Sequence, residues 1–337
     1  MNKSDNTPEL LISSLAIAAA VLGLSGCVQK LGRYEDSRSL MDTFVTVIVF
    51  ADDEVSANTA INAAFMRIEE IEKKASIFDE SAEAFHLNRD GYLDNPSVDL
   101  LKLVNMSKNY YRLTDGYFDI SVQPLLELWG EDELWKESAE MQQQKIDDAM
   151  QLVDSDNVYA DSNSIDFSRD GMKITLGGIA KGYAADEALK VLHENGIEHA
   201  LVTLGGDMSA LGSKPERELW QASLSNPDDT GQRLATFSFS DRSITTSGNY
   251  ERYFDPQKQA GHLLNPRTGY SSNGCISVTM IAKNGSLSDS LATAVFVMGP
   301  EAGLELIESL DDVECFIVDT ERAIHRSSGL EEYLNQG

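Results

Sequence analysis

The sequence predicts an α+β fold, in which mixed or antiparallel sheets are flanked by helices within one large domain. Segments of alternating, β-branched residues predict strands, and segments with an apolar period near 3.6 residues predict helices. The two kinds of segment interleave along the chain. Several predicted strands nevertheless follow one another through short turns, as hairpins do, so the class is α+β and not a strictly alternating parallel arrangement.

The first residues have the pattern of an export signal. Residues 10–24 form an apolar run of signal-peptide length, too short for a comfortable transmembrane helix. The run ends in Leu24-Ser25-Gly26-Cys27, which resembles a bacterial lipobox; an ordinary signal peptide or an anchor helix is the alternative. We therefore expect residues 1–26 to be a lipoprotein signal peptide and Cys27 to carry lipid. The mature protein would then be held on the periplasmic side of a bacterial membrane, inner or outer.

The segment 27–40 is polar and is predicted to be a lipidated tether ahead of a folded domain over residues 41–332. Residues 118–130 are expected to turn into a buried segment, and 130–165 are acidic and partly helical. Helices are predicted, with ends marked by glycine or Asn-Gly, over 57–76, 100–116, 182–194, 286–299 and 300–310. Strands are predicted over 41–51, 172–178, 199–207, 219–226, 233–241, 242–254, 274–282 and 313–319.

The charge of the chain excludes some partners. It has 27 basic and 55 acidic residues and a formal charge of −28. Nucleic acid and anionic lipid headgroups are poor partners for such a surface, and an anionic substrate would need a bound cation. Of the three cysteines, Cys275 and Cys315 lie in apolar runs. Buried free thiols are the default interpretation for them, and a disulfide in an oxidising periplasm is the alternative.

One predicted helix carries a candidate metal site. Asp289 and Thr293 are one helical turn apart and therefore lie on one face. Both offer hard oxygen, which suits Mg²⁺ or Ca²⁺ and does not suit zinc. The alternative is structural: an aspartate near a helix start interacts with the helix dipole, and a threonine can bond back to a carbonyl.

Two glycine turns and a histidine are candidates for ligand contact. Residues 177–182, Gly-Gly-Ile-Ala-Lys-Gly, match neither a P-loop nor Gly-x-Gly-x-x-Gly. The Gly-Gly pairs in this turn and in residues 204–212 allow close approach of backbone to a ligand, or tight packing of the turn on a sheet. His262 precedes an Asn-Pro-Arg-Thr-Gly turn over 265–269 and could be an acid–base group or a structural residue.

Seven motifs follow one another over residues 41–318. They are MDTFVTV, FDISVQPLLELWG, LGGIAKGYAADEA, LVTLGGDMSALG, TSGNYERYF, HLLNPRTGY and SDSLATAVFVMG. Taken together and in this order, they resemble the ApbE family of FAD:protein FMN transferases. The family often has Asp where Thr175 stands, and Phe-Gly or similar where Glu131-Asp132 follow the Leu-Trp-Gly of the second motif.

The resemblance implies a single T-fold-like, ApbE-like domain with FAD as substrate and Mg²⁺ as cofactor, with Ca²⁺ as a substitute. The implied metal ligands are the main-chain oxygen of Ala180 and the side chains of Asp289 and Thr293. The implied flavin contacts are Met41, Trp129, Gly130, Lys181, Asp186, His262, Leu263 and Leu264.

The resemblance also implies the reaction. A Ser or Thr hydroxyl of a target protein attacks the phosphorus on the FMN side of FAD, AMP leaves, and FMN stays on the target. The implied targets are flavin-carrying subunits of membrane redox complexes. His262 is the candidate for handling the hydroxyl proton, with Asp186 and Asp207 as other carboxylate candidates. A Mg²⁺-dependent FAD pyrophosphatase and a non-catalytic lipoprotein that binds or stores FAD remain as alternative functions.

Overall fold

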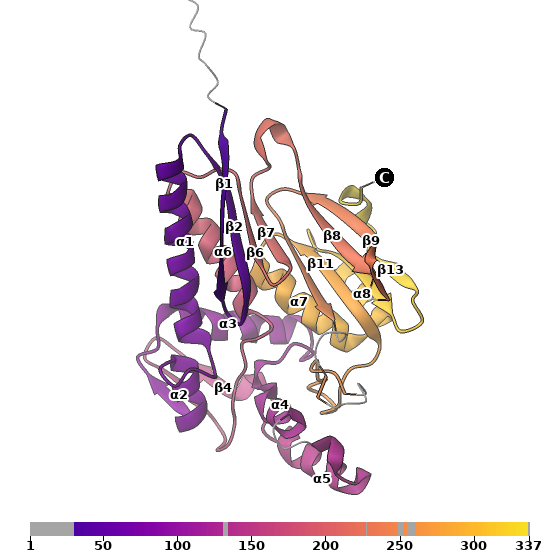
Figure 1. The fold of residues 1–337 in the computed structure, drawn as a ribbon. Helices are drawn as coiled ribbons and strands as arrows, with labels where there is room; N and C mark the ends of the chain where they lie inside the picture. Colours follow the sequence, from indigo (N-terminus) through magenta and orange to yellow (C-terminus); the bar gives the residue numbers. More distant parts are fainter. Residues whose placement is uncertain (1–29, 131–133, 227, 249–252, 255–259, 336–337) are drawn as a thin grey trace, which may run out of the picture. The chain divides into compact units, whose positions relative to one another are not determined.

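An eight-stranded antiparallel sheet organises the protein (Figure 1). Its strand order is β1-β2-β6-β7-β10-β11-β12-β13, and every neighbouring pair is antiparallel. The antiparallel α+β class predicted from the sequence is confirmed. The strands are β1 Gly32–Leu40, β2 Thr43–Ala51, β6 Ala200–Leu204, β7 Asp207–Leu211, β10 Ser243–Gly248, β11 Cys275–Ala282, β12 Glu314–Asp319 and β13 Ile324–Arg326.

The computed structural model describes residues 30–130, 134–226, 228–248, 253–254 and 260–335. The predicted signal peptide, Cys27 and the pair Glu131-Asp132 lie outside these residues. Residues from Leu31 onward belong to one unit. None of the described helices has the length and apolar character needed to cross a membrane.

The predicted tether is wrong over residues 32–40. These residues form β1, which pairs along its whole length with β2 and makes one edge of the sheet. The sequence pattern does not predict this strand because its side chains are mostly polar and half exposed. An edge strand with alternating exposure needs no apolar stripe when its neighbour supplies the core contacts.

Different elements pack on the two faces of the sheet. Val45, Val47 and Val49 of β2 pack into a cluster with the helices α1 and α6, whereas Ile48 and Phe50 of the same strand pack toward β8 and β9. The alternation follows directly from the period of a strand. The helices are α1 Glu54–Ala75, α2 Glu83–Asp90, α3 Val98–Leu113, α4 Gln123–Gly130, α5 Ala139–Met150, α6 Ala180–Glu194, α7 Gly285–Met298 and α8 Pro300–Glu308. The remaining strands are β3 Tyr92–Asp94, β4 Val158–Ala160, β5 Ser164–Phe167, β8 Trp220–Asn226 and β9 Asp229–Phe239.

The predicted strand over 172–178 is not present. The segment has no regular secondary structure and ends in a turn at 177–178, and the side-chain amide of Asn88 makes the contacts that a neighbouring strand would make. Asn88 Nδ2 donates to the carbonyl oxygen of Ile174 at 2.8 Å, and its Oδ1 accepts from the Ile174 N–H at 2.7 Å. The Thr175 N–H donates to the Ile120 carbonyl at 2.7 Å. The polar backbone is satisfied in this way without a ladder.

Two tight hairpin tips lie together at one end of the sheet. Met41 and Asp42 join β1 to β2 with φ of 53° and 55°, and Gly205 and Gly206 join β6 to β7 with φ of 61° and 103°. Two-residue loops with positive φ suit the twist of the flanking strands. The Gly205 N–H donates to the carbonyl oxygen of Phe44 at 3.1 Å, which links the tips.

The two described cysteines are buried free thiols. In the register of β11 and β12, Cys315 lies opposite Met280 and Cys275 lies opposite Asp319. The default interpretation is therefore confirmed, and the disulfide alternative is excluded in this structure. Burial raises the pKa of each thiol to about 12, so both are weak nucleophiles.

Candidate active site

The helices α6 and α7 touch backbone to backbone close to the hairpin tips. A Cβ on Gly182 would lie 2.1 Å from the carbonyl oxygen of Gly285. Only glycine allows this approach, and it brings Asp289 of α7 against the first turn of α6. Asp289 is 5% exposed, and its Oδ2 accepts the Gly182 N–H at 3.2 Å.

The carboxyl of Asp289 is buried and is acted on by the charges of Lys181 and Asp207. Burial raises its pKa from 3.8 to about 6, the charge of Lys181 opposes that shift, and the charge of Asp207 adds to it. A buried carboxylate with a raised pKa gains stability from any cation that pairs with it.

Thr293 and the Gly-Gly turn close the other side of this position. A Cβ on Gly178 would lie 3.1 Å from Thr293 Oγ1, and Ser290 Oγ donates to the Gly178 carbonyl at 3.3 Å. The main chain from Gly178 through Ala180 to Gly182 therefore runs along the face of α7 that carries Asp289 and Thr293. The two predicted side-chain ligands thus contact the residues on either side of Ala180, while the role of the Ala180 carbonyl stays a prediction.

The chemistry of these donors fits Mg²⁺. A carboxylate, a hydroxyl and a main-chain carbonyl are hard oxygens, and Mg²⁺ commonly completes its shell with water and substrate phosphate. Within the described residues, no group of three or more His, Cys, Asp or Glu could hold a metal. A metal at this place would therefore depend on backbone, hydroxyl and substrate oxygens beside the one carboxylate.

Lys181 has a partner that sequence reasoning did not assign. Its Nζ donates to Asp207 Oδ2 at 2.6 Å, and Asp207 Oδ1 accepts the Thr246 N–H at 3.0 Å. Asp207 follows the Gly205-Gly206 tip directly. In the sequence, this pairing is indicated only by the lysine that follows one Gly-Gly turn and the aspartate that follows the other.

Asp186 binds the N-terminus of α7. Its two oxygens accept the Gly285 N–H at 2.6 Å, the Ser286 N–H at 2.9 Å and the Ser286 hydroxyl at 2.8 Å, so it caps α7 from a neighbouring helix. Burial raises its pKa despite these bonds. The expected flavin contact of Asp186 stays a prediction, and its carboxylate is already engaged by the start of α7.

Met41 is held at the sheet tip by a half-buried acid. Its N–H donates to Glu72 Oε1 of α1 at 2.7 Å. Burial raises the pKa of Glu72, and the bond from Met41 lowers it. A non-glycine residue with positive φ needs such support, and residues of this kind cluster at functional sites.

Trp129 and Gly130 end α4 beside a group of aromatic rings. Trp129 is 6% exposed, and its Nε1 donates to the Gly269 carbonyl at 2.8 Å. Its ring stacks on Phe254 with centroids 6.5 Å apart. A Cβ on Gly130 would lie 3.4 Å from the Phe254 ring, so a small residue is favoured there.

The segment 262–264 joins two clusters. Leu263 packs against the cluster of α7, and Leu264 packs in the cluster that contains Trp129. His262 is half-buried and precedes them. Leu264 thus lies in one cluster with Trp129, while the flavin contacts of this segment and the acid–base role of His262 stay predictions.

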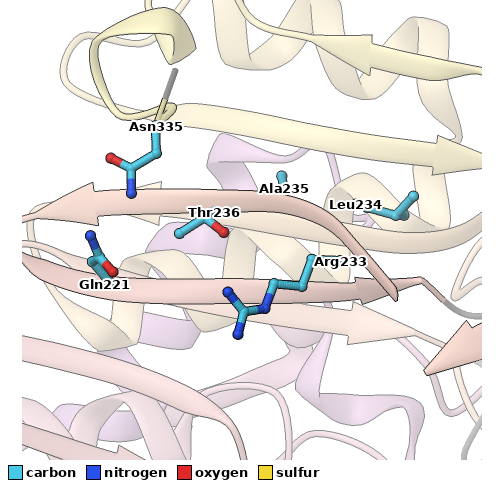
Figure 2. Close-up of a pocket in the computed structure, with 6 residues that line it drawn as sticks. All are labelled: Gln221, Arg233, Leu234, Ala235, Thr236 and Asn335. Carbon is cyan, nitrogen blue, oxygen red and sulfur yellow. The ribbon is translucent and has the colours of Figure 1, made fainter. Parts of the chain in front are cut away.

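A separate hollow of about 390 Å³ lies on the β8–β9 sheet (Figure 2). None of the residues around it is a predicted site residue. It is lined by Gln221, Arg233, Leu234, Ala235, Thr236 and Asn335.

Known proteins resemble the chain over most of its length. A protein of Haemophilus influenzae described as FAD:protein FMN transferase is 24% identical over 92% of this chain and 94% of its own. A Klebsiella pneumoniae protein of the same description is 27% identical over 88% and 92%. The crystal structure of the ApbE protein of Thermotoga maritima superposes with a TM-score of 0.80 at 28% identity, covering 90% of this chain and all of the other.

Two further comparisons agree. The apo flavinyl transferase ApbE of Pseudomonas stutzeri has the same fold, with a TM-score of 0.78 at 24% identity over 92% of this chain and 99% of the other. The ApbE family model matches residues 41–317, a range that contains α1 to α8 and the sheet strands from β2 to β11. The chain therefore belongs to the ApbE family.

Proposed function

We propose that the chain is an FAD:protein FMN transferase that works with Mg²⁺ at the junction of α6 and α7. The proposed reaction moves the FMN part of FAD onto a Ser or Thr hydroxyl of a target protein and releases AMP. The relatives' described activity supports the reaction. The observation that supports the site is the pair of contacts that flank Ala180: Gly178 lies against Thr293, and the Gly182 N–H donates to Asp289.

Each group at the junction has a task in this proposal. The Ala180 carbonyl and the oxygens of Asp289 and Thr293 would hold Mg²⁺, which when bound draws charge from the FAD pyrophosphate. Gly177 and Gly178 let the backbone approach the phosphates, and the start of α6 favours negative charge. Lys181 adds the basic side chain of this turn. Phosphoryl transfer needs mainly positioning and charge stabilisation, so few side chains suffice.

The acceptor hydroxyl must lose a proton during transfer. His262 is the proposed base, because an imidazole is suited to accept a proton near neutral pH and because its segment packs both on α7 and on the Trp129 cluster. Trp129, Leu263 and Leu264 would then line the flavin side of the site. The proposed targets are flavin-carrying subunits of membrane redox complexes.

We further propose that the protein is a lipoprotein. The proposal rests on Leu24-Ser25-Gly26-Cys27 after an apolar run, and the lipid on Cys27 would hold the enzyme on the periplasmic side of a bacterial membrane.

One experiment separates the three candidate functions. The protein is incubated with FAD, Mg²⁺ and a purified acceptor subunit, and the acceptor mass and free AMP are measured. An acceptor mass gain equal to FMN supports the transferase. AMP without that gain supports an FAD pyrophosphatase, and neither product supports a storage protein; either result would contradict the proposal.

A further inference from the structure

Asp207 binds the ammonium group of Lys181, the residue that follows the proposed metal ligand Ala180. One of its oxygens accepts from Lys181 Nζ at 2.6 Å, and the other accepts the Thr246 N–H at 3.0 Å. The Asp207 side chain is only 11% exposed. A carboxylate bonded through both oxygens and largely buried has one orientation, and it therefore holds Lys181 in one direction.

Lys181 stands beside a second carboxylate. Asp289 Oδ2 binds the N–H of Gly182, the next residue along the chain, and the charge of Lys181 acts on Asp289. Asp289 is buried, so it would attract a nearby ammonium strongly. An ammonium bound to Asp289 would occupy the oxygen that a metal needs.

We propose that Asp207 is a positioning residue of the metal site, which holds Lys181 toward β7 and so keeps the Asp289 carboxylate open to Mg²⁺. The inference rests on the proposed function, because it takes Asp289 as the metal ligand. It gives Asp207 a role through Lys181, without direct contact between Asp207 and metal or substrate.

A double-mutant cycle tests this inference. Mg²⁺ binding to the full chain without FAD is measured by calorimetry for the unchanged protein, Asp207→Asn, Lys181→Met and the double variant. Asp207→Asn keeps an acceptor for Thr246 but removes the negative charge that pairs with Lys181, and Mg²⁺ affinity falls about 10–100-fold, the range typical of outer-shell changes. Lys181→Met restores most of that loss, because the competing ammonium is gone. In the unchanged background the same substitution does not lower Mg²⁺ affinity, because it removes a positive charge that acts on Asp289.

Controls separate this role from general damage. Ser209→Ala removes a buried hydrogen bond to Ser243 on the same face of β7 and leaves Mg²⁺ affinity unchanged. Asp207→Glu keeps the negative charge and retains affinity within a few-fold, which also serves if Asp207→Asn does not fold. Additive effects of Asp207→Asn and Lys181→Met would overturn the inference alone, as would an equal loss in Asp207→Glu. Absence of Mg²⁺ binding by the unchanged protein would overturn the proposed metal site and the inference with it.

Discussion

Gly182 of α6 and Gly285 of α7 meet so closely that a Cβ on Gly182 would lie 2.1 Å from the Gly285 carbonyl oxygen. This contact sets the distance between the two helices that carry the proposed metal ligands. The geometry of the proposed metal site therefore depends on the packing of these two helices and not on the conformation of a loop.

Gly182→Ala is expected to destabilise the protein by about 1–3 kcal/mol or more, because overpacking against backbone forces the helices apart. The midpoint of urea unfolding measures the change. Gly177→Ala is the matched control, since the closest atom to its Cβ, Thr175 Oγ1, is 3.6 Å away. Equal unfolding midpoints for the two variants would show that the helices do not depend on the glycine contact.

Asp289→Ala is expected to lower FMN transfer by orders of magnitude while FAD binding is less affected. The variant loses the anionic ligand at a site where other donors are neutral. Removal of Mg²⁺ by EDTA should have the same effect on the unchanged protein, and Thr293→Ala should be milder because water can replace a hydroxyl. Full turnover by Asp289→Ala under excess chelator would rule out the metal role.

Asp289→Asn is expected to stabilise the metal-free protein above pH 6. The folded state raises the pKa of Asp289 from 3.8 to about 6, so it holds the proton more tightly than the unfolded state does. The free energy of unfolding therefore falls by an amount of the order of 3 kcal/mol as the pH rises from about 4 to about 6, and it stays lower above pH 6. The Asn variant lacks this loss. Thermal unfolding in EDTA should show a gain at pH 8 that vanishes near pH 4; a gain that is independent of pH would contradict the cause.

His262→Gln is expected to slow transfer about 10²–10⁴-fold and to flatten the acidic limb of the pH–rate profile, because the variant has no imidazole to protonate. The measurement is the initial rate of acceptor flavinylation across about pH 5–9, a span that contains the ordinary titration of histidine. A loss of only a few-fold with the profile intact would assign His262 to packing against the flavin.

Cys27→Ser is expected to abolish lipid attachment and leave an unprocessed or misrouted protein. Labelling with palmitate in cells and fractionation of membranes report the change. Persistent label in the Cys27→Ser variant would disprove lipidation at this residue.

The sequence could predict the sheet class and most helices because their apolar periods are strong. It could not predict β1, whose polar side chains lie on a sheet edge, and it wrongly predicts a strand over 172–178. In that segment the side chain of Asn88, 86 residues away, replaces a neighbouring strand. Local pattern carries no information about such a distant partner.

In the site, too, local sequence pattern predicts some relationships between residues, and tertiary packing decides the others. Asp289 and Thr293 could be paired from helical spacing alone, since four residues always return to one face. The bond between Lys181 and Asp207 and the cap that Asp186 supplies to α7 join residues from separate elements. Charge type suggested that these residues matter, but only the packing of α6, α7 and β7 decides which of them face one another.

The ratio of AMP released to FMN attached decides whether the protein transfers FMN to an acceptor. The unchanged protein is given FAD, Mg²⁺ and an acceptor subunit, and AMP is quantified alongside the intact mass of the acceptor. A transferase releases one AMP for each FMN gained by the acceptor, and we expect neither product with Asp289→Ala. AMP release that continues at the same rate without acceptor, and an acceptor of unchanged mass, would contradict the proposed transfer.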